Sequence, residues 1–208
     1  MLESAATGSK NMSDNRIEKI DFDTMDFDAR YKILTGAVIP RPIALVSTIN
    51  ADKGINVAPF SSFMIASVEA GYLAFSVGPG EQPKTTLANI RRLRQFVINT
   101  VSEDIAEQVQ RCGEQPPANI RKVDLAKFRL VPSESIAVPR IAEAKIHFEC
   151  RLRRIIRFGD SHMVVGAILL MHAQSGLVAQ GKIDPLRYAP LGRIAGRNYC
   201  RVRDIVSV

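Results

Sequence analysis

The sequence predicts a mainly β protein, a small antiparallel β-barrel with short peripheral α-helices packed outside it. Short apolar runs separated by turn-forming residues occupy residues 43–77, and two longer strands follow between residues 146 and 171. Between these two groups lies a stripe of apolar residues that recur every three positions, which is typical of a helix. At 208 residues the chain can bury one substantial core. We therefore expect a single domain.

The first four strands follow from the alternation of apolar runs and turns. Residues 43–48 form a compact apolar run, and the sequence Asn-Ala-Asp-Lys-Gly at 50–54 has turn chemistry. Further strands are expected at residues 55–59, 63–68 and 72–77. Four short strands with turns between them predict a meander that curls into a barrel.

A helix is expected to begin near Thr85. Its apolar stripe consists of Leu87, Ile90 and Leu93. Residues 96–101 return to the pattern of a strand. Ser102 then has the character of an N-cap, with acidic residues in the first turn after it, and Gly113 is a plausible end of that second helix. The sequence thus predicts two short helices on either side of a fifth strand.

The C-terminal half predicts a long excursion and two long strands. Residues 114–144 contain four prolines and little periodicity, which indicates a path over the surface. In residues 146–152 apolar residues alternate with His147, Glu149 and Arg151, so one face should be wet. The alternation slips at residues 153–154, which predicts a β-bulge. The next strand is apolar on both faces and needs a cover, for which a second subunit is the economical candidate.

Charge and composition exclude several classes of protein. The net charge is +7, yet the basic residues are not concentrated in one helix and no nucleic-acid motif accompanies them, so we expect no nucleic-acid partner. An anionic small ligand explains a basic chain equally well. The longest apolar run, residues 163–171, is about half as long as a membrane helix, so no membrane partner is expected either.

Cysteine usage and the N-terminal segment bear on the compartment and the domain limits. The three cysteines are Cys112, Cys150 and Cys200. They are odd in number and widely spaced, so we expect neither zinc nor a disulfide framework, and a reducing cytoplasm fits. The first fifteen residues are small and polar, unlike a secretory signal. We expect a disordered or extended tail at 1–24 and one domain at 25–208.

Two polar clusters about twenty residues apart predict a phosphate site. The first is Ser61 and Ser62, where the chain leaves a strand and turns. The second is Lys84, Thr85 and Thr86 at the start of a helix, with Asn89 one turn further on. Hydroxyls, a lysine and the free amides of a helix N-terminus are groups that hold a phosphate monoester. Taken separately, each cluster has a plain alternative, because Thr85 could merely cap the helix, Lys84 could be solvated and the serines could form a turn.

The combined pattern resembles the flavin reductase-like family of FMN-binding split barrels. The resemblance rests on residues 31–36, 41–48, 56–61 and 84–90, on Gly166, and on a tail that contains Pro190, Leu191, Gly192, Arg193 and Tyr199. It implies a six-stranded antiparallel split barrel of the FMN-binding type. It also implies a homodimer in which the flavin lies at the subunit interface.

The resemblance also implies roles for individual residues. Ser47 and Thr48 would face the isoalloxazine edge, together with the backbone around Asn56, Ala58 and Pro59. The ribityl phosphate would be held by Ser61, Ser62, Lys84, Thr85, Thr86 and Asn89. Arg193 and Tyr199 would approach the flavin from the C-terminal segment.

The implied activity is that of an NAD(P)H-dependent flavin reductase. NADH or NADPH would pass a hydride to FMN, with FAD as a possible exchanging substrate, and reduced flavin could supply a separate monooxygenase. Hydride transfer to flavin needs no acid, base or nucleophile from the protein, so we assign no catalytic residue. Two other functions stay open: a carrier or redox sensor that holds FMN without turning over nicotinamide, and an oxidase of a small substrate.

Overall fold

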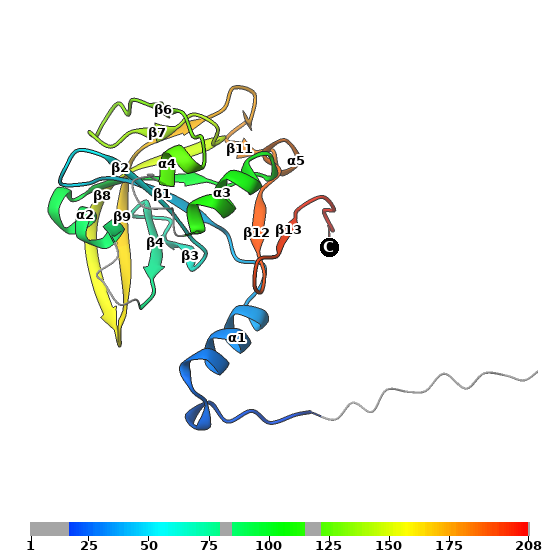
Figure 1. The fold of residues 1–208 in the computed structure, drawn as a ribbon. Coiled ribbons are helices and arrows are strands. Elements are labelled where there is room, and N and C mark those ends of the chain that lie inside the picture. The colour runs from blue at the N-terminus through cyan, green and yellow to red at the C-terminus, as the bar shows by residue number, and fades with distance from the viewer. Residues whose placement is uncertain (1–16, 80–84, 115–121, 208) are drawn as a thin grey trace, which may run out of the picture.

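One antiparallel sheet of seven strands organises the described part of this computed structural model, residues 17–79, 85–114 and 122–207. In spatial order its strands are β2, β1, β5, β8, β9, β4 and β3 (Figure 1). Their bounds are β1 Ala44–Ile49, β2 Ile55–Phe60, β3 Phe63–Ser67, β4 Tyr72–Val77, β5 Gln95–Thr100, β8 Ile146–Phe158 and β9 Ser161–Ala173. The predicted fold class is confirmed, with seven strands in the sheet where the family resemblance implied six.

The short strands begin and end within one residue of the predicted ranges, but their order is not that of a meander. The β1–β2 and β3–β4 hairpins lie at opposite ends of the sheet, with β5, β8 and β9 between them, so that prediction was wrong. The sheet curls until its two ends meet, since the ring of Phe60 on β2 lies 5.0 Å from that of Phe75 on β4. The result is a partly open barrel.

Helices cover the outside and one end of the barrel. Their bounds, with those of the shorter elements, are η1 Phe22–Thr24, α1 Phe27–Ala37, α2 Thr85–Leu93, η2 Glu103–Ile105, α3 Ala106–Gly113, α4 Lys122–Leu125, β6 Leu130–Val131, β7 Arg140–Ile141, β10 Val178–Ala179, β11 Lys182–Ile183, α5 Pro185–Tyr188, β12 Leu191–Arg193 and β13 Tyr199–Arg201. Leu87 and Ile90 of α2 join the core inside the curl, as their stripe predicted. Val109 of α3 joins a second core on the outer face of β1 and β2. No described helix is long and apolar enough to cross a membrane.

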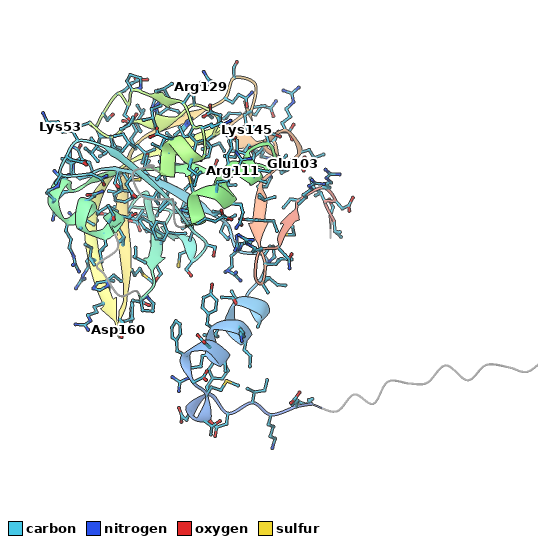
Figure 2. All side chains as sticks on the ribbon, in the orientation of Figure 1. Lys53, Glu103, Arg111, Arg129, Lys145 and Asp160 are labelled. Carbon is cyan, nitrogen blue, oxygen red and sulfur yellow. The ribbon has the colours of Figure 1, made fainter. Side chains whose placement is uncertain are left out.

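The two long strands form a hairpin with the predicted irregularity. The pairing of β8 with β9 shifts between Leu152 and Arg154, which confirms the bulge, and a second shift occurs between Glu149 and Cys150. Gly166 of β9 faces Phe96, whose ring a Cβ at this position would overlap. The tip of the hairpin, marked by Asp160, points away from the body of the barrel (Figure 2).

Residues 130–144 pack onto the outer face of the sheet, so the part of the sheet beneath them is shielded from solvent. Val138 and Ile141 are fully buried against the outer face of the sheet. Beneath the segment lie His147 and Glu149, which are 7% and 0% exposed. The prediction that this face of β8 is exposed to solvent is therefore wrong at these two positions, because a distant part of the chain covers them.

The N-terminal and C-terminal elements of the described chain both lie outside the barrel (Figure 1). The β12–β13 ribbon lies against α3, and α1 projects from the body beyond it (Figure 1). Glu103, labelled in Figure 2, forms ion pairs with Arg201 and Arg203. These pairs fasten the C-terminal segment to η2. The exchange of backbone hydrogen bonds between Arg41 and Arg193 joins the ribbon to the chain just before β1.

Candidate functional site

Strand β2 lies at the centre of the candidate site, and its C-terminal end opens onto an apolar cavity. Ser61 and Ser62 form the turn into β3 and line this cavity of about 330 Å³. Its other walls are Val38, Pro40, Arg41, Pro42, Phe63, Met64, Ala74, Phe75, Ser76 and Met163. A concave, mostly apolar space with a few hydroxyls at one side suits a flat aromatic ring. The predicted serine cluster is therefore at a cavity.

The other end of β2 meets the start of α2 through a network of side-chain hydrogen bonds. The amide of Asn56 donates to the hydroxyl of Thr86 over 2.9 Å. The amide of Asn89 donates to the hydroxyl of Thr48 over 3.0 Å and to the Asn50 side-chain oxygen over 2.7 Å. Four of the predicted residues thus come together, and they tie the helix start to the β1–β2 hairpin.

Burial separates the residues of this network that support the site from those that a ligand can reach. Thr48, Thr86 and Asn89 are 0%, 2% and 5% exposed, so their side chains lie below the surface and hold α2 in place. Thr85 is exposed at the first turn of α2, where free backbone N–H groups favour an anion. Lys84 lies outside the described residues.

Not all of the predicted residues share one surface. Among the described side chains, no hydrogen bond joins Ser61 or Ser62 to Thr85 or Thr86. The two clusters lie toward opposite ends of β2, whose six residues span roughly 17–20 Å. Their convergence on one phosphate stays a prediction.

Ser47 points away from the barrel interior. Its hydroxyl donates to the carbonyl of Pro139 over 2.7 Å and accepts from the Asn99 amide, and its side chain is fully buried. Asn99 in turn accepts from the backbone N–H of Ile141. Both side chains therefore hold the 130–144 segment on the sheet. The predicted contact of Ser47 with the isoalloxazine edge remains a prediction.

A second cavity, lined largely by polar groups, contains four predicted residues. It measures about 350 Å³, and we call it the polar cavity. Its walls include the predicted Pro59, Ser61, Arg193 and Tyr199, and also Tyr31, Thr35, Arg41, Ile43, Val109, Gln110, Gly113, Ile194 and Gly196. Ala58, on the opposite face of β2 from Pro59, packs against the barrel core. Sequence reasoning assigned no role to Arg41 or Gln110, because an isolated Arg or Gln carries no spacing signal.

The remaining titratable cluster lies under the 130–144 segment and consists of Glu149, His172, His147 and Arg140. The carboxylate of Glu149 accepts the backbone N–H groups of residues 134 and 135 over 2.9 and 2.6 Å. His172 Nε2 donates to it over 2.7 Å, and Arg140 Nε lies 3.9 Å away. We call this group the Glu149 cluster.

The pKa values in the Glu149 cluster follow from burial and hydrogen bonding. Burial alone would raise the pKa of Glu149, but its backbone donors and His172 together lower it. Burial lowers the pKa of His147, against the opposing effect of its bond to the carbonyl of Ile141. Both shifts favour an ionised Glu149 beside a neutral His147. A neutral buried histidine and a fully bonded carboxylate indicate a structural cluster.

Comparisons with known proteins agree with the fold. A nitrilotriacetate monooxygenase component B from Bacillus cereus is 28% identical, with 94% of this chain and all of that chain covered and a TM-score of 0.90. A 2-nitrobenzoate 2-nitroreductase from Pseudomonas fluorescens is 36% identical, with 92% and 95% covered and a TM-score of 0.85. A split barrel domain from Shewanella frigidimarina, 14% identical over 89% and 94% of the two chains with a TM-score of 0.80, shares the fold.

The family assignment rests on a match that covers most of the chain. The model of the flavin reductase like domain matches residues 35–194. This range includes strand β2, whose C-terminal end adjoins both cavities, and also the start of α2 and strand β12. The chain belongs to the flavin reductase like domain family.

Proposed function

We propose that the protein is an FMN-binding oxidoreductase that takes a hydride from NADH or NADPH. The observation that carries the proposal is the apolar cavity beside Ser61 and Ser62 in a chain of the flavin reductase like family. When bound, the flavin supplies the redox chemistry. The protein's own contribution is to bind and orient it, since the cavity excludes water from a flat ring and its serine hydroxyls offer hydrogen bonds at one edge.

The start of α2 is the proposed anchor of the ribityl phosphate. Thr85 is exposed there, at a first turn whose backbone N–H groups have no partner within the helix, and the amides of the half-buried Asn56 and the buried Asn89 hold the helix from behind. Lys84, next in the chain, would add a full positive charge. The residues present therefore fit a phosphate monoester at this end of β2.

The Lys84→Ala substitution tests the anchor. Losing a charge-assisted hydrogen bond should weaken FMN binding by about tenfold or more. Lys182→Ala on the exposed strand β11 removes the same charge elsewhere and should leave FMN binding unchanged. Fluorescence titration of FMN into the protein freed of flavin would measure both, and equal affinities for Lys84→Ala and the wild type would remove Lys84 from the site.

The activity itself is tested on the flavin that purifies with the protein. We expect FMN to be released by heat, and we expect the bound flavin to bleach in the visible range when NADH or NADPH is mixed with it anaerobically in a stopped-flow instrument. Bound FMN that bleaches with neither nicotinamide would instead favour a carrier or redox sensor. Colourless protein that ignores added FMN would overturn the flavin assignment.

The acceptor of the electrons has two candidates. Reduced flavin could leave for a separate monooxygenase, since a 28% identical relative from Bacillus cereus is a component B of nitrilotriacetate monooxygenase. Alternatively the acceptor could be a small aromatic compound that binds beside the flavin, since a 36% identical relative is a 2-nitrobenzoate 2-nitroreductase. Turnover of NADH with added FMN, compared with turnover with 2-nitrobenzoate, would separate the two.

We also propose a homodimer in which α1 contacts the second subunit. Its residues Phe27, Tyr31 and Leu34, followed by Val38, are spaced by about one turn and are 62%, 59%, 50% and 61% exposed. No residue of α1 is buried, and an apolar helical stripe of this kind marks an interaction surface. Leu169 and Met171 of β9 are exposed as well, on the strand whose two apolar faces predicted a cover.

Sedimentation velocity would test the dimer. The double substitution Phe27→Asp and Leu34→Asp should shift the wild-type dimer toward a monomer, because two charges would enter the interface. Lys32→Asp, on the same helix but outside the stripe, is the control and should stay dimeric. A monomeric wild type at micromolar concentration would overturn the proposal.

A further inference from the structure

The polar cavity is built from four parts of the chain that are distant in sequence. Tyr31 and Thr35 come from α1, Pro59 and Ser61 from the end of β2, and Gln110 from α3. Arg193 and Tyr199 complete it from the β12–β13 ribbon. Arg41 and Ser61 line the apolar cavity too, so the two cavities adjoin and share a wall.

The polar cavity contains two positive charges and no carboxylate among its lining residues. Arg41 donates to the backbone carbonyls of Thr35, Val38 and Ile194. Within the described part of the chain, neither Arg41 nor Arg193 forms an ion pair. A half-buried charge without a counter-charge is costly unless a ligand supplies one.

The neighbouring carboxylate does not neutralise these arginines. Glu114 follows Gly113 of the cavity wall, but its carboxylate accepts from Arg197, with which it forms an ion pair. Glu103 is likewise paired, with Arg201 and Arg203. The positive charge of the polar cavity is therefore not cancelled from its rim.

The guanidinium of Arg193 is held in a fixed orientation. It lies over the ring of Tyr199, with its central carbon 4.6 Å from the ring centroid, and it donates to Gln110 and to the carbonyl of Gly196. Tyr199 also donates to Gln110 over 2.8 Å. A guanidinium fixed in this way loses little conformational entropy when it binds a two-oxygen anion.

We propose that the polar cavity binds the anionic oxygen group of an aromatic ligand whose ring lies at the mouth of the adjoining apolar cavity, against the flavin ring that the proposed function places there. The inference rests on the proposed function in that the ring would then lie beside the flavin. The anion is a carboxylate or a phosphate, because both match the guanidinium fork. The first would come from a benzoate-type acceptor, and the second from the nicotinamide cofactor itself.

Binding of benzoate and of its uncharged analogue benzamide tests the site. The wild type, with its native flavin content, should bind benzoate about tenfold or more tightly than benzamide by isothermal titration calorimetry. Arg193→Gln should lose that preference while its benzamide affinity stays the same. Arg187→Gln removes a charge from the exposed side of α5 and should keep the preference.

A second arm distinguishes the two sources of the anion. If the site serves the nicotinamide, inorganic pyrophosphate should displace benzoate and Arg193→Gln should raise the KM for NADH. If it serves an acceptor, pyrophosphate should not compete, and only the KM for 2-nitrobenzoate should rise. Either outcome supports an anion site and names its ligand.

Equal affinities of the wild type for benzoate and benzamide would overturn the proposal, and so would an unchanged preference in Arg193→Gln. If Arg193→Gln does not fold, Arg193→Lys keeps the charge without the fork and should weaken benzoate binding only in part. Failure of the proposed function has a different signature. The benzoate preference would then be intact in a protein that neither retains FMN nor oxidises NADH.

Discussion

The Glu149 cluster and the polar cavity both keep charge partly or wholly away from water, and they do so in opposite ways. Glu149 is fully buried, yet two backbone N–H groups and His172 bind its carboxylate. Arg41 and Arg193 are only half-buried, yet their partners are neutral carbonyls and side chains. The more deeply buried charge is thus the better compensated one.

The difference separates groups that serve the fold from groups that are available to a ligand. A compensated carboxylate fastens the 130–144 segment to β8, so removing it should reduce stability. An uncompensated guanidinium contributes little to the fold and has hydrogen-bonding capacity left for an anion. Substitutions in the two regions should therefore affect different measurements.

Glu149→Gln should have the largest effect on stability. One oxygen becomes an NH₂ group that faces a backbone N–H donor, and the charge that His172 binds is lost, so we expect the free energy of unfolding to fall by about 3 kcal/mol. Urea denaturation at neutral pH would measure it. Glu107→Gln, in an exposed ion pair with Arg111, is the control and should change little. A loss no larger than the control's would show that the Glu149 cluster does not hold the segment.

Acid should destabilise the protein through the same cluster. The folded state lowers the pKa of His147 below the ordinary 6.5, so the unfolded chain binds more protons and stability is lost as pH falls below about 6.5. Glu149, whose pKa is also lowered, adds to the loss only below about 4.5.

His147→Gln separates the two contributions. This variant should lack the fall in melting temperature between about pH 6.5 and 5, while the wild type shows it. Parallel curves for the two proteins would mean that another group carries the dependence.

Asn89→Ala tests the uncharged hydrogen-bond network that joins the start of α2 to the β1–β2 hairpin. The substitution removes the 3.0 Å hydrogen bond to the Thr48 hydroxyl and the 2.7 Å hydrogen bond to the Asn50 side-chain oxygen, so we expect a loss of about 2 kcal/mol. FMN affinity should fall as well, because the start of α2 would no longer be fixed. Thermal denaturation and FMN titration would measure the two effects, and Ala88→Ser on the exposed side of α2 serves as a control.

The sequence predicted the features that depend on local interactions and missed those that depend on contacts between distant parts of the chain. Strands such as β1 and β4 were predicted because alternation and turn residues are local signals. The strand order was not, since nothing in the β1–β2 hairpin records that its neighbour is β5. His147 and Glu149 were misread for the same reason, because the groups that bury them belong to residues 130–144.

The residues of the candidate site were likewise predictable only where a local pattern marks them. Thr86 and Asn89 were found in a spaced polar cluster and Asn56 and Thr48 through the family resemblance, and the structure brings the four together. Arg41 lies inside one of the patterns that carried the family resemblance, but its place in a cavity depends on α1 and the β12–β13 ribbon. A cavity lined by four distant segments has no local signature.

Arg193→Gln should have the smallest effect on stability, and it tests the contrast from the other side. The variant loses the contact with Tyr199 and the hydrogen bonds to Gln110 and to the carbonyl of Gly196, but these are made by a half-buried group to neutral partners, so we expect a change of only about 1 kcal/mol. Added benzoate should raise the melting temperature of the wild type and not that of the variant, because a ligand stabilises only the state that binds it. A loss as large as that of Glu149→Gln would place Arg193 among the groups that stabilise the fold, and the contrast between the two regions would disappear.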